Sequence, residues 1–105
     1  MAFTNTTGRY ASFGIVTSLP SEIIDSFWYT IDQYLKHVIP LKKIIHFKLR
    51  NNKGKVSITF SQDRNKDVMT IDTPYKFDPF YPHTVYVIDR NGRETITLPD
   101  ELTIL

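Results

Sequence analysis

The chain has 105 residues, no cysteine and a formal net charge of +2 at pH 7. That length fits one domain with one small hydrophobic core. The composition excludes a disulfide framework, a thiolate zinc site and a membrane-spanning apolar stretch, and the first residues lack the pattern of a secretory signal.

Residues 1–8 are mostly small and polar, which predicts a flexible tail before a single globular domain at residues 9–105. Residues 9–19 then alternate between two faces, which is typical of a strand. Gly14 within this stretch indicates a bulge or a close approach of another backbone.

Residues 20–38 carry the strongest helix pattern in the chain. Pro20 suits the first helical turn, and Pro40 favours a stop. The apolar positions are spaced three and four apart along one side of the helix: Ile24, Phe27, Trp28, Ile31, Leu35 and Val38. The pattern predicts an amphipathic helix with Trp28 at the centre of the core.

After Pro40 the apolar period changes to two, which predicts a hairpin over residues 44–61 with a turn at residues 51–54. We expect Arg50 to lie opposite Lys55. That register puts the facing apolar pairs on one side of the sheet: Leu49 with Val56, Phe47 with Ile58, and Ile45 with Phe60.

A second hairpin is predicted at residues 83–98, because Asn91-Gly92 suits the two central positions of a type I′ turn. Its register places Val87 opposite Ile96 and Val85 opposite Leu98. Between the hairpins, residues 62–67 read as a loop and residues 68–73 as a short strand. The prolines of residues 74–82 exclude a helix or a central strand there.

The expected fold is therefore α+β, with an about five-stranded, mainly antiparallel sheet and one amphipathic helix on one face. The order along the chain is β-α-β-β-(β)-β-β. No internal repeat or linker divides the domain.

One candidate site is a basic hairpin for nucleic acid or another anion. Its members lie between residues 42 and 55, where there is no carboxylate: Lys42, Lys43, His46, Lys48, Arg50, Lys53 and Lys55. The alternative is a solvated face whose lysines discourage edge-to-edge pairing. No Tyr or Phe of the hairpin is interleaved with the basic face, which counts against a stacking platform.

The other candidate is a protein-binding patch in the proline-rich segment, formed by Tyr75, Phe77, Phe80 and Tyr81. The alternative is a loop folded over the open end of the core.

No catalytic, metal or cofactor site is identified. His83 lies near Asp78, Tyr81 and Asp89 in the sequence, but no nucleophile with an orienting base accompanies them. His37 and His46 stand alone, and the chain has neither a paired-histidine motif nor a glycine-rich phosphate loop.

Three stretches carry a family resemblance: GRYASFGIV, LPSEIIDSFWYTID and VYVIDRNGRETITLPDEL. Together they resemble the small Firmicute proteins of a staphylococcal family of unknown function (domain of unknown function number 960), from about Gly8 to Leu102. The resemblance implies a small bacterial cytoplasmic protein, with an association with mobile elements as a further expectation, and implies no reaction.

These observations favour a non-enzymatic module that binds a protein partner. The alternative is a nucleic-acid or anion binder that uses the basic hairpin. Self-association through exposed sheet edges is a third reading.

Overall fold

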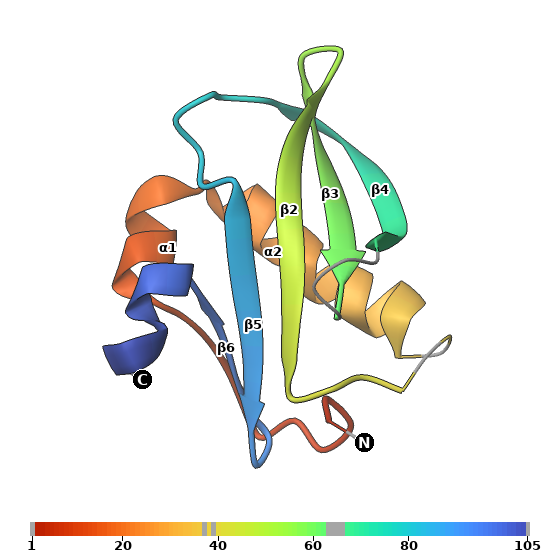
Figure 1. Ribbon diagram of the computed structural model, residues 1–105, viewed down its shortest axis with the longest axis vertical. Helices are drawn as coiled ribbons and strands as arrows, with labels where there is room; N and C mark the ends of the chain where they lie inside the picture. The colour runs from red at the N-terminus through yellow and green to blue at the C-terminus, as the bar shows by residue number, and fades with distance from the viewer. Residues whose placement is uncertain (1, 37, 39, 63–66, 105) are drawn as a thin grey trace.

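The computed structural model describes residues 2–36, 38, 40–62 and 67–104. Six strands form one curled sheet in the order β1-β6-β5-β2-β3-β4 (Figure 1). The strands are β1 (Gly8–Ala11), β2 (Ile44–Asn52), β3 (Lys55–Ser61), β4 (Asp67–Lys76), β5 (Thr84–Arg90) and β6 (Arg93–Thr97). The helical elements are α1 (Phe13–Ser18), α2 (Ser21–Thr30), the π-helical turn η1 (Ile31–Leu35) and the 3₁₀ helix η2 (Pro99–Ile104). The α+β class is confirmed, and the predicted strand number is too low by one.

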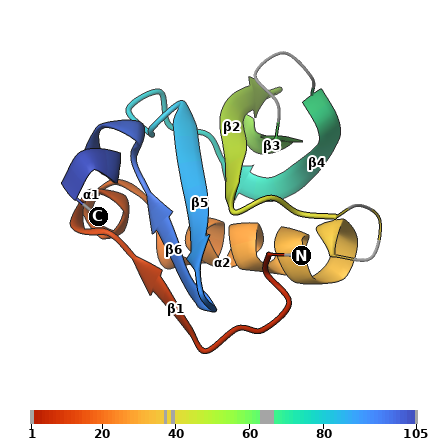
Figure 2. The same ribbon diagram turned by 60° about the horizontal axis from the view of Figure 1, so that its bottom comes forward.

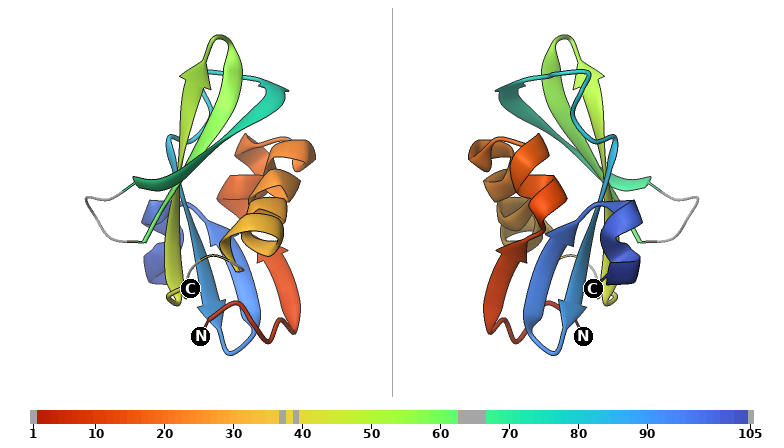
Figure 3. Two further views of the ribbon diagram at one scale, coloured as in Figure 1. Left: turned by 90° about the vertical axis from the view of Figure 1, so that its right-hand side faces the viewer. Right: turned by 90° about the vertical axis from the view of Figure 1, so that its left-hand side faces the viewer.

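The sheet is mixed. Strand β1 pairs with β6 in parallel, and the remaining neighbours are antiparallel. Helices α1 and α2 lie on one face of the sheet and η2 lies on the other (Figure 3). The sheet curls, so that β4 comes to lie beside α2 (Figure 2).

The predicted strand at residues 9–19 is correct only for its first part. After β1 the chain turns at Ser12, whose Oγ accepts a hydrogen bond from the Ile15 N–H as the N-cap of α1. Gly14 marks a close approach, because a Cβ there would lie 2.6 Å from Leu98 Cδ1. An alternating pattern predicts a strand, but the cap and the packing of Gly14 on the C-terminal segment favour a short helix here.

The long helix forms as predicted, but a different side of it faces the sheet. Pro20 is the N-cap and the helix begins at Ser21. Phe27 is fully buried, with its ring centroid 5.0 Å from that of Phe47, whereas Trp28 is only partly buried. Trp28 is therefore not the centre of the core. The apolar stripe is wider than one row of side chains, and the sheet covers the Phe27 row.

The helix ends in η1, where the Lys36 N–H donates to the Ile31 carbonyl five residues earlier. Val38, predicted to belong to the buried stripe, is 63% exposed. Residues 37 and 39, including the lone His37, lie outside the described residues.

The first hairpin has the predicted faces but a register shifted by two residues. Asn52 pairs with Lys55, and Leu49 lies opposite Ile58 and Phe47 opposite Phe60. The turn contains only Lys53 (φ 52°) and Gly54 (φ 90°), so both central residues take the left-handed conformation of a type I′ turn. Because the shift is even, the same apolar side chains still share one face.

The second hairpin is confirmed. Val87 lies opposite Ile96, and the turn residues Asn91 and Gly92 have φ values of 54° and 92°. Strand β6 ends at Thr97, so the predicted pair of Val85 and Leu98 falls just beyond the ladder.

The predicted short strand is longer than expected and includes Pro74. The missing N–H of Pro74 is tolerated because β4 is an edge strand that pairs only with β3. Of the predicted loop, residues 63–66 lie outside the described residues and Asp67 already begins β4. The proline-rich segment is irregular only after Lys76.

The N-terminal segment is not a free tail. Phe3 is fully buried, and its N–H donates to Asp89 Oδ2 at 2.8 Å. The Thr7 N–H donates to the Gly92 carbonyl at 2.8 Å. Small polar residues predict a frayed end, but Phe3 completes the core beneath the β5–β6 turn and holds the segment in place.

Candidate functional site

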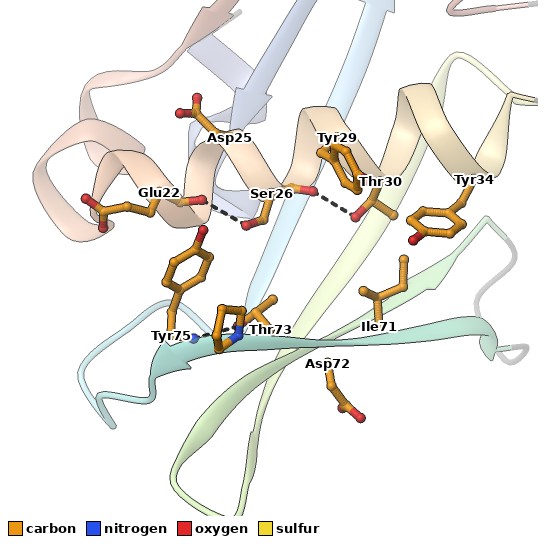
Figure 4. A pocket seen from close by; sticks show the side chains of 11 residues that line it. Glu22, Asp25, Ser26, Tyr29, Thr30, Tyr34, Ile71, Asp72, Thr73 and Tyr75 are labelled. Atoms are coloured by element: carbon orange, nitrogen blue, oxygen red, sulfur yellow. Dashed lines mark hydrogen bonds between the residues drawn. The ribbon is translucent and has the colours of Figure 1, made fainter.

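A groove runs between α2 and the edge strand β4 (Figure 4). Its cavity volume is about 440 Å³. The helix contributes Glu22, Asp25, Ser26, Tyr29, Thr30 and Tyr34, and the strand contributes Ile71, Asp72, Thr73, Pro74 and Tyr75. Two elements distant in sequence therefore form its two walls.

Two tyrosines of the helix dominate one wall. Tyr29 and Tyr34 are 58% and 42% exposed, and their rings meet edge to face at 6.0 Å between centroids. They lie five residues apart, and the π-helical turn η1 begins between them. Tyrosine combines a large apolar face with a polar tip, so this pair offers contact area to a partner without leaving a purely apolar patch.

The second wall of the groove is β4, which is an edge strand of the sheet. Thr73 Oγ1 donates to the Val56 carbonyl at 2.8 Å and accepts from the Tyr75 N–H, which marks an irregular register beside Pro74. In an antiparallel edge strand, alternate residues direct their N–H and C=O groups away from the sheet. Strand β4 thus offers backbone groups along its outer side.

The groove is acidic. Glu22 and Asp25 are exposed carboxylates on the helix wall, and no Lys, Arg or His is among the described residues that line it. Asp72 points away from the groove in Figure 4, where its Oδ1 accepts hydrogen bonds from Ser57 and Asn52. The negative charge available to a ligand therefore comes from the helix, where the Asp25 carboxylate points away from β4 and lies at the rim of the groove (Figure 4).

The proline-rich segment does not form one exposed aromatic patch. Tyr75, Phe77 and Tyr81 are partly buried against the core, and the rings of Phe77 and Tyr81 meet at 6.5 Å. Phe80 alone is open, at 92% exposure. Of the four predicted residues, Tyr75 belongs to the groove, and Phe77 and Tyr81 close the end of the core.

The basic hairpin residues are spread along the whole of β2. Lys42 and Lys43 precede the strand and line a separate hollow with Asp89 and Asn91, whereas Lys53 and Lys55 lie at the hairpin tip. At ~3.4 Å per residue the two pairs are about 30 Å apart. The central members, His46, Lys48 and Arg50, share the face of the sheet opposite α2.

Two expectations about that face need correction. Arg50 lies opposite Ser57 and not opposite Lys55 as predicted, and Lys55 lies opposite Lys76 on β4. An aromatic ring is also present, because β5 brings Tyr86 beside His46, where the two rings stack at 4.5 Å. The sequence of the hairpin alone does not indicate that β5 lies beside β2.

A polar centre joins β1, β6 and η1. The guanidinium of Arg9 donates to Asp32 Oδ2 at 2.7 Å and to Glu94 Oε1 at 3.0 Å, and it lies 4.7 Å from the Trp28 ring centroid. The hydrogen bond from Arg9 is the main reason why the pKa of Asp32 is lowered, and the same bond raises the pKa of Arg9. The partners of Arg9 are so distant in sequence that no local pattern indicates them.

Comparison with known proteins places the chain in a family. The family model described as staphylococcal protein of unknown function (DUF960) matches residues 8–101. The chain belongs to the DUF960 family. The predicted resemblance is confirmed over nearly its whole extent.

A solved structure is also similar to the chain. It is described as the crystal structure of the protein of unknown function from Enterococcus faecalis, with 51% sequence identity, 90% of each chain covered and a TM-score of 0.85. No curated protein matches. DUF960 is therefore a bacterial family without a named activity.

The described part of this DUF960 chain shows no grouping of His, Asp or Glu that could hold a metal ion. The residues near His83 have structural contacts: Asp78 Oδ1 accepts from the Phe80 N–H, and Asp89 Oδ1 accepts from the Gly92 N–H. Among the described helices, none has the length and apolarity needed to cross a membrane.

Proposed function

We propose that this protein is an interaction module that binds an extended, basic segment of a partner protein in the groove between α2 and β4. One observation carries the proposal: the sheet ends in an open edge strand directly beside an acidic groove with exposed tyrosines. An open edge is a template for another strand, and many peptide-binding domains use such an edge next to a helix.

The partner segment adds to β4 as a further strand. Its backbone pairs with the outward N–H and C=O groups of β4, and every second side chain faces the helix. Those side chains contact Tyr29 and Tyr34. Pro74 has no N–H to donate, so pairing is strongest along the part of β4 before Pro74.

Charge defines the chemistry of the partner. Glu22 and Asp25 attract Lys or Arg side chains, while a carboxylate of the partner is repelled in a groove without a lining cation. Exposed ion pairs contribute little affinity, so the acidic wall acts mainly on specificity, and the apolar contacts with the tyrosines carry the binding.

A display library of random linear peptides, selected on the intact protein, tests the proposal. We expect selected peptides to be rich in Lys or Arg and to shift the NMR amide signals of β4 and α2. Asp25→Lys should weaken the best peptide by about 3- to 5-fold, whereas the matched change Asp100→Lys, at an exposed carboxylate outside the groove, should leave its affinity unchanged.

Backbone pairing between the bound peptide and β4 can be tested separately. Methylation of single amide nitrogens along the peptide should weaken binding at every second position, because only alternate N–H groups face β4. A uniform effect of methylation, or amide shifts confined to surfaces away from the groove, would refute the proposal.

A further inference from the structure

The face of the sheet opposite α2, called here the outer face, has a composition of its own. The strand registers place the same row of side chains across β2, β5 and β6: His46 with Tyr86 and Thr97, and Ile44 with Ile88 and Thr95. By the same alternation Lys48 and Arg50 follow on β2, and Arg90 pairs with Arg93 at the β5–β6 turn.

The outer face is basic. It carries Lys48, Arg50, Arg90 and Arg93 on the central strands, and Asp72 is the one carboxylate among its strand residues with described side chains. The Asp72 carboxylate already accepts hydrogen bonds from Ser57 and Asn52. This face is therefore opposite in charge to the groove beside α2.

The 3₁₀ helix η2 also lies on this face, where it packs against β5, and it carries the acidic residues Asp100 and Glu101. Glu101 accepts hydrogen bonds from Ser12 Oγ and from the Gly14 and Leu98 N–H groups. The bond from Ser12 is the main reason why the pKa of Glu101 is lowered. Its carboxylate is thus engaged in holding η2 to the chain.

Aromatic rings lie between the cations. The rings of His46 and Tyr86 stack at 4.5 Å with 22° between their planes, and the Arg93 guanidinium lies 4.8 Å from the ring centroid of Tyr10. A stack of two rings can be extended by a nucleobase, since every base has a flat π-face.

A hollow lies at the Arg90 end of the face. Its volume is about 410 Å³, and its lining residues include Arg90, Arg93, Tyr10, Thr95 and Ile88. Arginine forks and hydroxyl donors suit a phosphate group, and no carboxylate lines this hollow among the described residues.

We propose that the outer face binds single-stranded nucleic acid. The strand lies along β2 and β5, with phosphates at Lys48, Arg50 and the Arg90–Arg93 hollow, and with a base stacked on the His46–Tyr86 pair. From Arg90 to Arg50 the path covers eight strand positions, about 27 Å, which corresponds to the low end of the roughly 4–16 nucleotides of known single-strand sites. The site is independent of the peptide groove.

Fluorescence anisotropy with labelled ten-nucleotide oligo-dT and oligo-U tests this proposal. Three phosphate contacts, at Lys48, at Arg50 and in the Arg90–Arg93 hollow, predict that log K falls with log salt with a slope of about −2.1. Heparin and a DNA duplex of equal length serve as comparators. Tighter binding to either comparator than to the single strands would overturn the proposal.

Two pairs of variants locate the site. Lys48→Glu with Arg50→Glu should abolish binding, whereas Lys43→Glu with Lys53→Glu, the same charge change away from the outer face, should retain most of it. Tyr86→Phe should bind normally, and Tyr86→Leu should lose about 5- to 150-fold, the usual value of one stacked base. Circular dichroism confirms folding of each variant. Equal losses in both charge variants, or equal affinity of the Tyr86 variants, would contradict the proposal.

Discussion

Arg9 and Asp32, 23 residues apart in the chain, form an ion pair with Arg9 Nη1 2.7 Å from Asp32 Oδ2. The same guanidinium donates its Nε–H to Glu94, which has no exposed surface. Thr6 donates its hydroxyl to the other Glu94 oxygen. Arg9 therefore supplies the countercharge of a buried carboxylate and ties β1 to η1 and β6.

Arg9→Ala should destabilise the protein by on the order of 3 kcal/mol, because it leaves the buried Glu94 carboxylate without its cation. Arg93→Ala is the matched control, since its guanidinium only lies over the Tyr10 ring, and should cost about 0.5–1 kcal/mol. Urea unfolding measures both. Equal losses of unfolding free energy in the two variants would show that the ion pair between Arg9 and the buried Glu94 does not stabilise the protein more than the exposed contact of Arg93 does.

The Asp32 pair should make stability depend on pH. Arg9 lowers the folded-state pKa of Asp32 below its usual value of 3.8. The stabilisation that the Arg9–Asp32 pair gives to the folded state is therefore fully present above the unfolded-state pKa of Asp32. It is lost as the pH falls through the folded-state pKa. Wild type should be more stable than Asp32→Asn at about pH 7, and the difference should vanish toward about pH 2. A constant difference over that range would contradict the assignment.

Phe27 and Trp28 should differ in their contribution to the core. Phe27→Ala removes a fully buried ring packed on Phe47 and should cost about 3–5 kcal/mol. Trp28→Ala should cost less, although its side chain is larger, because Trp28 lies at the edge of the core beneath Arg9. Chemical denaturation measures the unfolding free energy of both variants. A greater loss for Trp28→Ala than for Phe27→Ala would be inconsistent with the observed helix orientation.

The proline-rich segment allows a similar comparison. Phe77→Ala should lower the melting temperature by several degrees, since the ring packs against the core and Tyr81. Phe80→Ala should leave it nearly unchanged, because the ring is 92% exposed. Differential scanning calorimetry measures both shifts, and a large shift for Phe80 would refute its placement.

The two turn glycines should respond differently to alanine. Both have positive φ, 90° at Gly54 and 92° at Gly92, so each Gly→Ala change carries roughly 1–2 kcal/mol of backbone strain. At Gly92 an added Cβ would also lie 2.3 Å from the Asn5 carbonyl oxygen, whereas nothing lies within 4 Å at Gly54. Gly92→Ala should therefore be clearly the more destabilising in urea unfolding. Equal effects would mean that the N-terminal segment does not pack on this turn.

The sequence predicts those features that depend on neighbouring residues. Asn91-Gly92 specifies a type I′ turn and thereby the register of its hairpin. The turn at Lys53-Gly54 has the same conformation, but a lysine does not signal it, so the predicted loop is two residues too long. The alternation of period two still assigns every apolar side chain of that hairpin to the correct face.

Neither candidate surface could be predicted in its final form. The groove combines Tyr29 and Tyr34 with Ile71, and the outer face combines Lys48 with Tyr86 and Arg93. Each set comes from segments at least thirty residues apart, and their proximity depends on the strand order and on the curl of the sheet.

The amino-acid sequence by itself determined the helix, the two hairpins and the apolar side of each strand, because turn chemistry and side-chain periodicity act over a few residues. Only the tertiary structure decided that Phe27 and not Trp28 is buried, that Phe3 is held in the core, and that an acidic groove and a basic face lie on opposite sides of one sheet. A periodic pattern defines a stripe or a face, but the elements that cover it are selected by packing among residues far apart in the chain.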